Sequence, residues 1–288
     1  MSTRAAPSSA PRQREFAFVP ADHRAIATIV YNEVGILLPE GKSQLVYGRL
    51  APRARACNLS SIGAYVNLIG RDAEERARAI DALTTNHTSF FRESHHFEDF
   101  AERLWPSLSE RLAKGGRVRL WSAACSSGEE PYSWLMSMFG SDRATAQRLL
   151  ACDLRMLATD VSPSVLDTAR QGAYSLATLK TVPADLRNAW VRGSGDQLTI
   201  DPLLRDAIAF RPLNLLGEWP MKGRFDAICC RNVMIYFDEP TKARLLERLC
   251  ERLEIGGVLY IGHSERLVGP AERCMDFVGR TTYRKVAA

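Results

Sequence analysis

The stretch that decides the fold is VRLWSAACSSGEEPYS, residues 118–133. Its first four residues form a short apolar run that is typical of a buried strand. A segment with the spacing of a helix follows, from about residue 128 to residue 139. A strand that passes through a short turn into a helix is the opening half of a βαβ unit, so this segment predicts a parallel sheet.

The turn inside this stretch, SAACSSGEEP, is rich in small residues, which let a ligand approach the backbone. Ser127 and Glu130 fit a capping box for the helix that follows, with Pro131 in its first turn. The turn lacks the G-x-G-x-x-G pattern of dinucleotide-binding folds, because Gly128 is its one glycine. A ligand-binding turn and a well-capped crossover helix therefore both remain open.

The alternation of strand and helix continues toward the C-terminus. Further strands are expected at 156–159, 225–230 and 258–261, and helices at 163–171 and 241–253, the last ended by Gly256 and Gly257. Residues 276–286 are expected to close the sheet as an antiparallel edge. Residues 173–211 interrupt the rhythm, and short strands at 197–200 and 208–210 predict a small inserted β-subdomain there. The predicted fold class is α/β, with a Rossmann-like, doubly wound sheet.

The N-terminal part of the chain has a different composition and a different spacing of apolar residues. Residues 1–15 offer almost nothing to bury and are predicted to form a disordered tail. Apolar residues at helical spacing predict a small all-helical domain over residues 16–84. Residues 85–114 are interpreted as a linker and a connecting helix that Pro106 bends, and residues 115–288 as the α/β domain.

Composition narrows the class of protein. The 288 residues are 46% hydrophobic and 25% charged, which is ordinary for a globular protein. Because no apolar run approaches the roughly 20 residues of a membrane span, and the N-terminus lacks the apolar core of a signal peptide, we expect a cytoplasmic protein without membrane insertion. The net charge of +5 is mild for a nucleic-acid binder. Seven cysteines without a C-x-x-C pair favour free thiols over disulfides or a zinc ribbon.

Polar residues follow the predicted strands, at the edge where ligands bind in open α/β sheets. Asp160 comes directly after the second strand, where a carboxylate commonly accepts hydrogen bonds from ribose hydroxyls; a helix N-cap is its alternative. Arg231 and Asn232 follow the third strand. If the chain stays extended beyond them, Tyr236 shares a face with Asn232 while Ile235 faces the core. A Tyr236 buried as a plain aromatic residue remains open.

The segment TTNHTSFFRE, residues 84–93, offers Asn86, Thr88 and Arg92 beside two phenylalanines as the wall of a cleft at a domain boundary. A plain interdomain hinge is the alternative. The pair His95–His96 follows this segment. Neighbouring residues of a helix point about 100° apart, and no carboxylate at ligand spacing accompanies the two imidazoles, so no metal site is expected.

Several segments together resemble the bacterial chemotaxis receptor methyltransferases, the CheR family. They occur in that family's order and are TTNHTSFFRESHHF, WSAACSSGEEPYS, ATDVSPSVLDTARQGAY, RPLNLL, FDAICCRNVMIYF and GHSE. The likeness covers about residues 20–285. It implies a class I methyltransferase fold that binds S-adenosylmethionine and esterifies glutamates on the cytoplasmic helices of chemoreceptors. The product would be S-adenosylhomocysteine, and no metal is implied.

The resemblance also implies which residues act. Those lining the cofactor site would be Asn86, Thr88, Arg92, Glu129, Asp160, Asn214, Leu215, Arg231 and Asn232. Asp160 would hold the ribose hydroxyls, and Glu129 would face the methionine end. Asn214 and Leu215 would lie by the adenine. Arg92 and Tyr236 would flank the reacting methyl group as the catalytic residues.

A set of basic residues in the helical domain suggests a partner. Lys42 and Arg49 are seven residues apart and share a helical face, which Arg53 joins if Pro52 leaves the phase intact. They form either a solvated charged face or, as the resemblance implies, the surface that docks on the acidic receptor helices. Some members of the family also dock on a tethered C-terminal peptide of the receptor through a glycine-bearing loop. Here that loop reads RGSGDQLTI, residues 192–200, which is shorter and has fewer glycines, so methylation by a monomer without that tether is expected.

Other functions stay open. One is a class I methyltransferase that acts on nucleic acid or a small molecule, although the positive charge is spread along the sequence rather than concentrated. Another is a module that binds receptors without catalysis. A nicotinamide oxidoreductase is disfavoured by the missing glycine fingerprint. A glutamate substrate, with a pKa of about 4.3, is already ionised at neutral pH and needs no general base.

Overall fold

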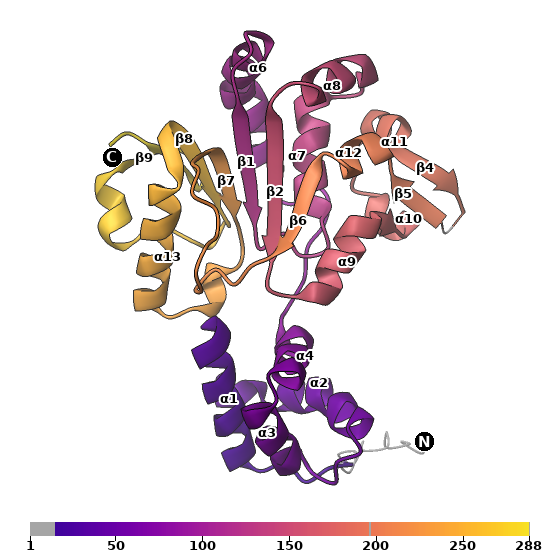
Figure 1. The fold of residues 1–288 in the computed structure, drawn as a ribbon, viewed down its shortest axis with the longest axis vertical. Helices are drawn as coiled ribbons and strands as arrows, with labels where there is room; N and C mark the ends of the chain where they lie inside the picture. The colour runs from indigo at the N-terminus through magenta and orange to yellow at the C-terminus, as the bar shows by residue number, and fades with distance from the viewer. Residues whose placement is uncertain (1–14, 196, 288) are drawn as a thin grey trace, which may run out of the picture. The chain divides into compact units, whose positions relative to one another are not determined.

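The structure is a computed structural model that describes residues 15–195 and 197–287 (Figure 1). The predicted tail at residues 1–15 lies outside the described residues except for Glu15, whose carboxylate pairs with Arg55. The chain divides into two compact units. Unit 1 comprises Met1–Glu33 and Leu38–Leu83, and unit 2 comprises Val34–Leu37 and Thr84–Ala288.

Unit 1 is all-helical, as predicted. Its elements are α1 (Pro20–Val34), the 3-10 turn η1 (Glu40–Lys42), α2 (Ser43–Ala56), α3 (Ile62–Arg71) and α4 (Ala73–Leu83). Ser61 caps α3, and its hydroxyl accepts the amide N–H of Ala64 at 3.1 Å. Each helix turns an apolar face inward, so that Ile26, Val46, Leu50, Ile62, Tyr65 and Ile69 are almost completely buried.

Unit 2 is built on a seven-stranded sheet with the order β6-β2-β1-β7-β8-β10-β9. Its strands are β1 (Val118–Ala123), β2 (Leu154–Asp160), β6 (Ile208–Pro212), β7 (Phe225–Cys230), β8 (Leu253–Ile261), β9 (Met275–Gly279) and β10 (Thr282–Lys285). The strands from β6 to β8 are parallel, whereas β10 is antiparallel to both neighbours. The predicted sheet and its antiparallel edge are confirmed. The strand order reverses between β1 and β7, so the sheet is doubly wound with its switch point there.

Helices cover both faces of this sheet (Figure 1). They are α5 (His95–Asp99), the π-helical turn η2 (Phe100–Leu104), α6 (Trp105–Ala113), α7 (Glu129–Phe139), α8 (Arg143–Leu150), α9 (Pro163–Gln171) and α13 (Glu239–Glu251), with 3-10 turns η3 (Met234–Tyr236) and η4 (Gly269–Arg273). Alternate strand residues enter opposite cores: Val258 and Tyr260 pack with α5 to α9, and Leu259 and Ile261 with α13. Within the described residues, none of these helices is long and apolar enough to span a membrane.

A smaller sheet forms part of the inserted region. It has the order β3-β5-β4, with β3 (Ala173–Tyr174), β4 (Val191–Ser194) and β5 (Gln197–Ile200), and the short helices around it are α10 (Leu176–Leu179), α11 (Ala184–Trp190) and α12 (Pro202–Arg205). The prediction that the strand at 208–210 belongs to this insertion is wrong. That strand is β6, which pairs with β2 at the edge of the main sheet. A short apolar run signals a strand but carries no information about its partner.

Two further local predictions are wrong. Gly256 and Gly257 do not end the preceding helix, because α13 stops at Glu251 and both glycines lie within β8. The predicted capping box also does not form. The N-cap of α7 is Gly128, with a φ of 96°, and the Ser127 hydroxyl donates to the carboxylate of Glu129 instead.

The lone glycine of the turn has a packing role. A Cβ at Gly128 would lie 2.8 Å from the Cβ of Ala169 and 3.0 Å from the hydroxyl of Tyr174. Its positive φ is also a conformation that residues with a Cβ rarely adopt. Glycine at this position therefore lets the start of α7 pass close to α9.

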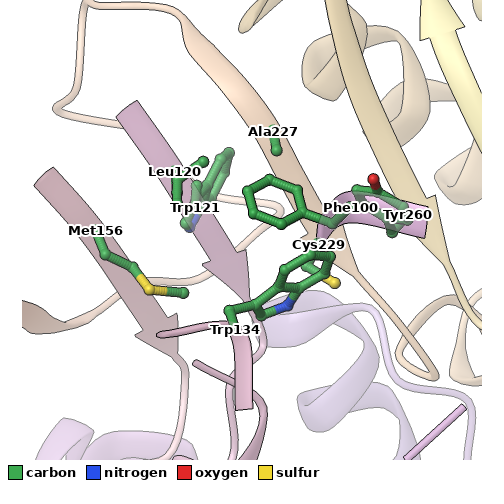
Figure 2. Close-up of a pocket in the computed structure, with 8 residues that line it drawn as sticks. All are labelled: Phe100, Leu120, Trp121, Trp134, Met156, Ala227, Cys229 and Tyr260. Carbon is green, nitrogen blue, oxygen red and sulfur yellow. The ribbon is translucent and has the colours of Figure 1, made fainter. Parts of the chain in front are cut away.

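A cavity of about 10 Å³ lies in the core of unit 2 (Figure 2). It is lined by Phe100, Leu120, Trp121, Trp134, Met156, Ala227, Cys229 and Tyr260. These side chains are apolar or aromatic and come from the strands and from the helices that cover them. The cavity has room for about one water molecule, so it is a packing void rather than a ligand site.

Candidate active site

The polar residues predicted at the strand ends lie at one edge of the main sheet. Because β1, β2, β6, β7 and β8 are parallel, their carboxyl ends meet there. Each of these strands is followed by a segment singled out in the sequence, namely 124–130, 160–162, 213–215, 231–232 and 262–265. This edge of unit 2 is the candidate site.

The turn between β1 and α7 is fixed against the end of β2. The carboxylate of Asp160 accepts the amide N–H of Ser126 at 2.8 Å and that of Ser162 at 3.0 Å. The Ser126 hydroxyl donates to the carbonyl of Asn86 at 3.0 Å, which ties the segment TTNHTSFFRE to the same turn. The side chain of Ser162 caps α9, so the alternative of Asp160 as N-cap is wrong. Asn86 and Asp160 thus meet around one turn.

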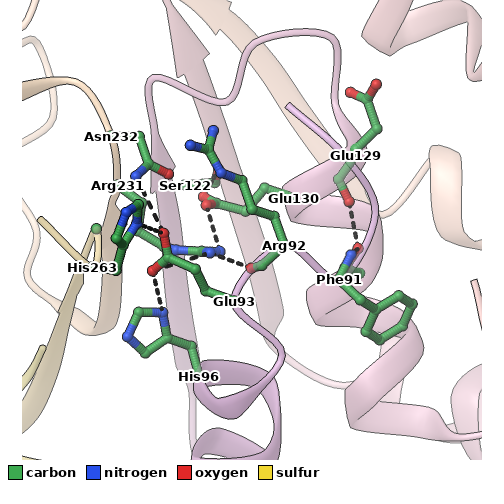
Figure 3. A network of polar contacts seen from close by, with 12 residues as sticks. Phe91, Arg92, Glu93, His96, Ser122, Glu129, Glu130, Arg231, Asn232 and His263 are labelled. Carbon is green, nitrogen blue, oxygen red and sulfur yellow. Dashed lines mark hydrogen bonds and ion pairs between the residues drawn. The ribbon is translucent and has the colours of Figure 1, made fainter. Parts of the chain in front are cut away.

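Glu129, at the start of α7, is a buried carboxylate with only 5% of its surface exposed. Its Oε2 accepts the hydroxyl of Ser127 at 2.7 Å. In the described part of the chain no arginine or lysine pairs with it, and burial raises the pKa of Glu129, against a smaller lowering by Ser127. A ligand with a positive charge would relieve this penalty. The carboxylate points away from the charged network around Arg231 (Figure 3).

A second group of predicted residues meets at Glu93, directly after Arg92 (Figure 3). The Glu93 Oε1 accepts hydrogen bonds from Nδ1 of His263 at 2.9 Å and from Nδ2 of Asn232 at 3.2 Å. Its Oε2 lies 3.6 Å from the Arg231 guanidinium, which also donates to the carbonyl of Arg92. Three residues predicted from the sequence, Arg92, Arg231 and Asn232, therefore share one network.

Arg231 is the buried cation that pairs with the carboxylates of this network. Its side chain is 2% exposed, and Nη1 lies 3.2 Å from Oε2 of Glu130. Burial raises the pKa of Glu93, but the hydrogen bond of His263 and the charge of Arg231 outweigh it and lower that pKa to about 2. Conversely, burial lowers the pKa of Arg231, and the charge of Glu130 leads the contributions that leave it raised. The Nη1 and Nη2 atoms of Arg231 and the side-chain amide of Asn232 are thus engaged within the protein.

The chain does not stay extended after β7, so the condition under which Tyr236 would share a face with Asn232 is not met. Asn232 has a φ of 59°, and Met234–Tyr236 form the 3-10 turn η3. Consequently Ile235 does not face the core but is 47% exposed. Tyr236 is partly buried and packs against the core under α13.

Glu265 holds this turn in place. Its carboxylate accepts the amide N–H of Asn232 at 3.0 Å, of Met234 at 2.8 Å and of Gly262 at 2.6 Å. Burial raises the pKa of Glu265, although the three backbone donors work against that rise. The segment GHSE after β8 and the segment after β7 are therefore joined through one side chain.

The remaining predicted cofactor residues lie along the same edge. Arg92 Nη1 donates to the carbonyl of His87 at 2.9 Å. Thr88 is partly buried. Asn214 Oδ1 accepts the amide N–H of Leu216 at 2.9 Å. Leu215 is buried. The loop after β6 is connected to the end of β2, because the amide of residue 213 donates to the carbonyl of Asp160 at 2.9 Å.

The predicted docking residues belong to unit 1. Lys42 ends η1 and is exposed, whereas Arg49, in α2, donates to the carbonyl of Leu83 at 2.7 Å. Arg53 makes hydrogen bonds of 2.6–2.9 Å to both carboxylate oxygens of the buried Glu75. Burial raises the pKa of Glu75, but the hydrogen bond from Arg53 leads those that leave it lowered. Arg53 is therefore part of the packing of unit 1.

Sequence reasoning missed Glu93 as a member of the site, and it placed residues 262–265 at this edge without giving His263 or Glu265 a role. All three lie inside quoted segments, but no spacing rule connects residue 93 with residue 263. The backbone conformation does mark this edge of the sheet. Seven described non-glycine residues have a positive φ, and five of them, Phe91, Glu93, Ala124, Ser126 and Asn232, lie at or next to this edge. Such conformations concentrate at functional sites.

The prediction about the two histidines is wrong in one respect. A carboxylate does accompany them, because possible ligand atoms of Glu93, His95 and His96 lie within 4.8 Å of one another. The reason is local: Glu93 has a φ of 58°, which no spacing argument anticipates. His96 is fully buried, and burial lowers its pKa to about 3.

The doubly wound sheet, its antiparallel β10 beside the edge strand, and the acidic residues at its carboxyl edge define a class I S-adenosylmethionine-dependent methyltransferase. The chain belongs to the CheR methyltransferase family. Residues 86–284 match the CheR methyltransferase SAM binding domain, and residues 21–84 match the CheR methyltransferase all-alpha domain.

Named relatives agree with this assignment over most of the chain. The chain is 43% identical over 263 residues to a probable chemotaxis protein methyltransferase of Rhizobium etli, covering 89% of this chain and 96% of that protein. It is 40% identical over 285 residues to chemotaxis protein methyltransferase 2 of Pseudomonas aeruginosa, covering 96% and 97%. It is 37% identical over 271 residues to the chemotaxis protein methyltransferase of Escherichia coli, covering 91% and 90%.

Proposed function

We propose that this protein transfers the methyl group of S-adenosylmethionine to glutamate side chains on the cytoplasmic helices of chemoreceptors, forming methyl esters for chemotactic adaptation. Its membership of the CheR family and the names of its relatives support the substrate class. The observation that carries the cofactor assignment is Glu129, a buried carboxylate with which no arginine or lysine of the described chain pairs.

The donor set at the strand ends fits this cofactor. Glu129 would pair with the ammonium group of its methionine part, which removes the cost of the buried charge. Asp160 accepts two amide N–H groups at the end of β2, and its carboxylate would also accept hydrogen bonds from the ribose hydroxyls. Asn214 and Leu215 would border the adenine, and Asn86 and Thr88 would complete the wall.

Arg231 and Asn232 serve the cofactor site in a different way. Because their side chains are engaged by Glu93 and Glu130, we expect them to hold the backbone of Arg92 and the turn after β7 in position. Direct contact with the ligand would then come from neighbouring backbone groups.

The cofactor supplies an electrophilic methyl group on a sulfonium when bound. The attacking glutamate is ionised at neutral pH, so neither a general base nor a metal ion is needed in the transfer. Arg92 and Tyr236 would orient the incoming carboxylate, and alignment supplies much of the acceleration. They must not bind it too strongly, since tight binding of the ground state slows the attack. Excluding water also helps, because both reactants lose charge in the transition state.

The test of this function is methyl transfer to a receptor. The purified protein, radiolabelled S-adenosylmethionine and a receptor cytoplasmic fragment should give label that is released as methanol by mild base. Arg92→Ala should reduce incorporation at least about 100-fold while the fold is retained, because the substrate carboxylate loses its orienting group. Arg103→Ala, at an exposed arginine of η2, is the matched control.

The alternatives have distinct outcomes in the same assay. Label in nucleic acid or a small molecule, with none in the receptor fragment, would establish the other methyltransferase class. Cofactor binding without transfer to any of these would favour a non-catalytic module. Full activity of Arg92→Ala would remove that residue from the mechanism.

We also propose which residues dock on the receptor. Lys42 and Arg49 of the helical domain, residues 16–84, dock on acidic receptor helices, whereas Arg53 contributes by stabilising that domain. The protein acts in the cytoplasm as a monomer, without membrane insertion or nucleic acid. The short hairpin of β4 and β5 supports methylation without a receptor tail peptide. Calorimetry that finds micromolar or tighter binding of such a pentapeptide would contradict this last point.

A further inference from the structure

Three polar side-chain atoms of unit 2 are buried near one another and have no hydrogen-bond partner among the described residues. They are Oε2 of Glu93, Nε2 of His95 and Nδ1 of His96. One possible ligand atom from each residue lies within 4.8 Å of the other two. A buried polar atom without a partner costs stability, so three in one place point to a missing bound group.

His96 is oriented as a metal-binding imidazole is. Its Nε2 lies 3.0 Å from the carbonyl oxygen of Arg280 and 3.0 Å from the hydroxyl of Thr281. A carbonyl can only accept, so Nε2 carries a proton and Nδ1 is left with its lone pair. A backbone carbonyl on the far ring nitrogen is the usual orienting partner of a metal-bound histidine.

The free nitrogen of His96 faces the carboxylate. His96 is fully buried, and its Nδ1 lies 3.7 Å from Oε2 of Glu93 (Figure 3). Bond lengths of about 2.1 Å in a tetrahedral zinc site place neighbouring ligand atoms roughly 3.4 Å apart. The observed spacing is therefore close to that of two ligands of one ion. The imidazole of His95 is the third, with its ring centroid 4.2 Å from that of His96.

The charge around the cluster also favours a cation. Glu93 and Glu130 both flank Arg231, so two carboxylates face one guanidinium in the buried network. The surplus of negative charge offsets the repulsion that Arg231 would exert on a bound ion.

We propose that Glu93, His95 and His96 bind a divalent transition-metal ion of the zinc class, with a fourth position open to water. Two imidazoles and one carboxylate suit a borderline ion, whereas magnesium and calcium prefer ligand sets made of oxygen. The site is separate from methyl transfer, which needs no metal ion. Its role is structural: the ion joins the start of α5 to the network that positions Arg231 and Asn232.

The test uses full-length protein without an affinity tag, treated with a chelator and titrated with Co²⁺ as a spectroscopic probe. We expect saturable binding of one ion, with the visible absorption of tetrahedral cobalt bound by nitrogen and oxygen, and displacement by Zn²⁺. His95→Asn and His96→Asn should each weaken Co²⁺ binding at least about 100-fold. His87→Asn, at an exposed histidine, is the matched control and should bind as the wild type does.

Several results would overturn the proposal. These are the absence of saturable binding, intense near-ultraviolet bands of cobalt–thiolate coordination, unchanged affinity in His95→Asn, or an equal loss in His87→Asn. Because replacement of the fully buried His96 can unfold the protein, the partly exposed His95 carries the comparison. A rise in melting temperature with Zn²⁺ in the wild type but not in His95→Asn is the second readout.

Discussion

At the scale of single residues, the site is marked by side chains that are costly to bury. Glu129 lies at the start of α7 with no arginine or lysine paired to it in the described chain, so folding disfavours its charged form. Arg231 is also buried, but two carboxylates compensate it. The first arrangement is unfavourable until a cation binds, whereas in the second the protein itself supplies the counter-charge of the arginine. We therefore expect the two residues to respond to mutation in opposite ways.

Glu129→Gln should raise stability and weaken ligand binding at the same time. The pKa of Glu129 is higher in the folded than in the unfolded protein. Its favourable contribution to the stability of the folded state is therefore complete below pH 4.5, and it is lost as the pH rises through the pKa of the folded state. The variant should thus melt above the wild type at neutral pH, with the difference vanishing near pH 4. Its affinity for S-adenosylhomocysteine should fall about 10- to 100-fold. Calorimetry and thermal melts at several pH values test both, with Glu247→Gln as exposed control.

Two observations would contradict this expectation. One is a variant that binds the product as tightly as the wild type does. The other is a wild-type affinity that stays constant as pH falls from 7 to 4, because protonation of Glu129 should remove the partner of the ligand's ammonium group.

Arg231→Met should destabilise the protein strongly. The substitution leaves the carboxylates of Glu93 and Glu130 buried without their cation, and breaking a buried ion pair in this way costs about 3–5 kcal/mol of the free energy of unfolding. Urea denaturation measures the loss. Adding Glu130→Gln to the same variant should recover part of it, since one uncompensated charge is then removed. A loss below about 1 kcal/mol would show that the network is not the stabilising unit described here.

At the scale of elements, one side chain joins the ends of two strands. The chain after β7 turns at Asn232 and forms η3. Glu265, after β8, accepts the backbone N–H groups of Asn232 and Met234 in that turn, together with that of Gly262. These donors would otherwise be partly buried without acceptors. The ordering of η3, which includes Tyr236, therefore depends on a residue outside it.

Glu265→Gln should loosen this turn without unfolding the sheet. An amide has one acceptor oxygen where the carboxylate has two, so at least one of the three backbone bonds is lost. Hydrogen exchange followed by mass spectrometry should show faster exchange in peptides covering residues 231–237, with β1 and β2 unchanged. Glu272→Gln, at an exposed position in η4, should exchange as the wild type does. Unchanged protection at residues 231–237 would mean that Glu265 does not hold the turn.

At the scale of the whole molecule, the two units have separate cores and different tasks. Every proposed cofactor residue belongs to unit 2, whereas the proposed docking residues belong to unit 1. Charge on unit 1 should then influence encounter with the receptor and leave cofactor affinity unchanged.

Lys42→Glu should lower kcat/KM for receptor methylation about three- to tenfold at low salt, because attraction to acidic helices is replaced by repulsion. The difference should shrink in 0.5 M salt, where charges are screened within a few ångströms. Lys114→Glu, an exposed lysine of unit 2, makes the same change in net charge and is the control. An equal effect of both substitutions would point to net charge rather than to a docking surface.

Much of the fold could be predicted because its signals are local. The apolar runs of β1, β2, β7 and β8 and the helical spacing of α7 and α9 each depend on a few consecutive residues. The prediction failed where partners mattered: the run at 208–210 was placed in the wrong sheet, and the turn after β7 was not anticipated. Pairing and turning depend on contacts that a local pattern does not contain.

By itself, the sequence determined the order of strands and helices, the family, and the set of residues at the strand ends, because each of these is written in short segments. Only the tertiary structure decided which of those residues meet. The amide of Asn232 and the carboxylate of Glu93 are 139 positions apart, and they meet because the end of β7 and a left-handed turn at Glu93 bring them together. The same packing left Glu129 without an arginine or lysine partner in the described chain and gathered Glu93, His95 and His96 into one cluster. Burial and charge are properties of neighbours in space, and neighbours in space are chosen by the packing of the whole sheet.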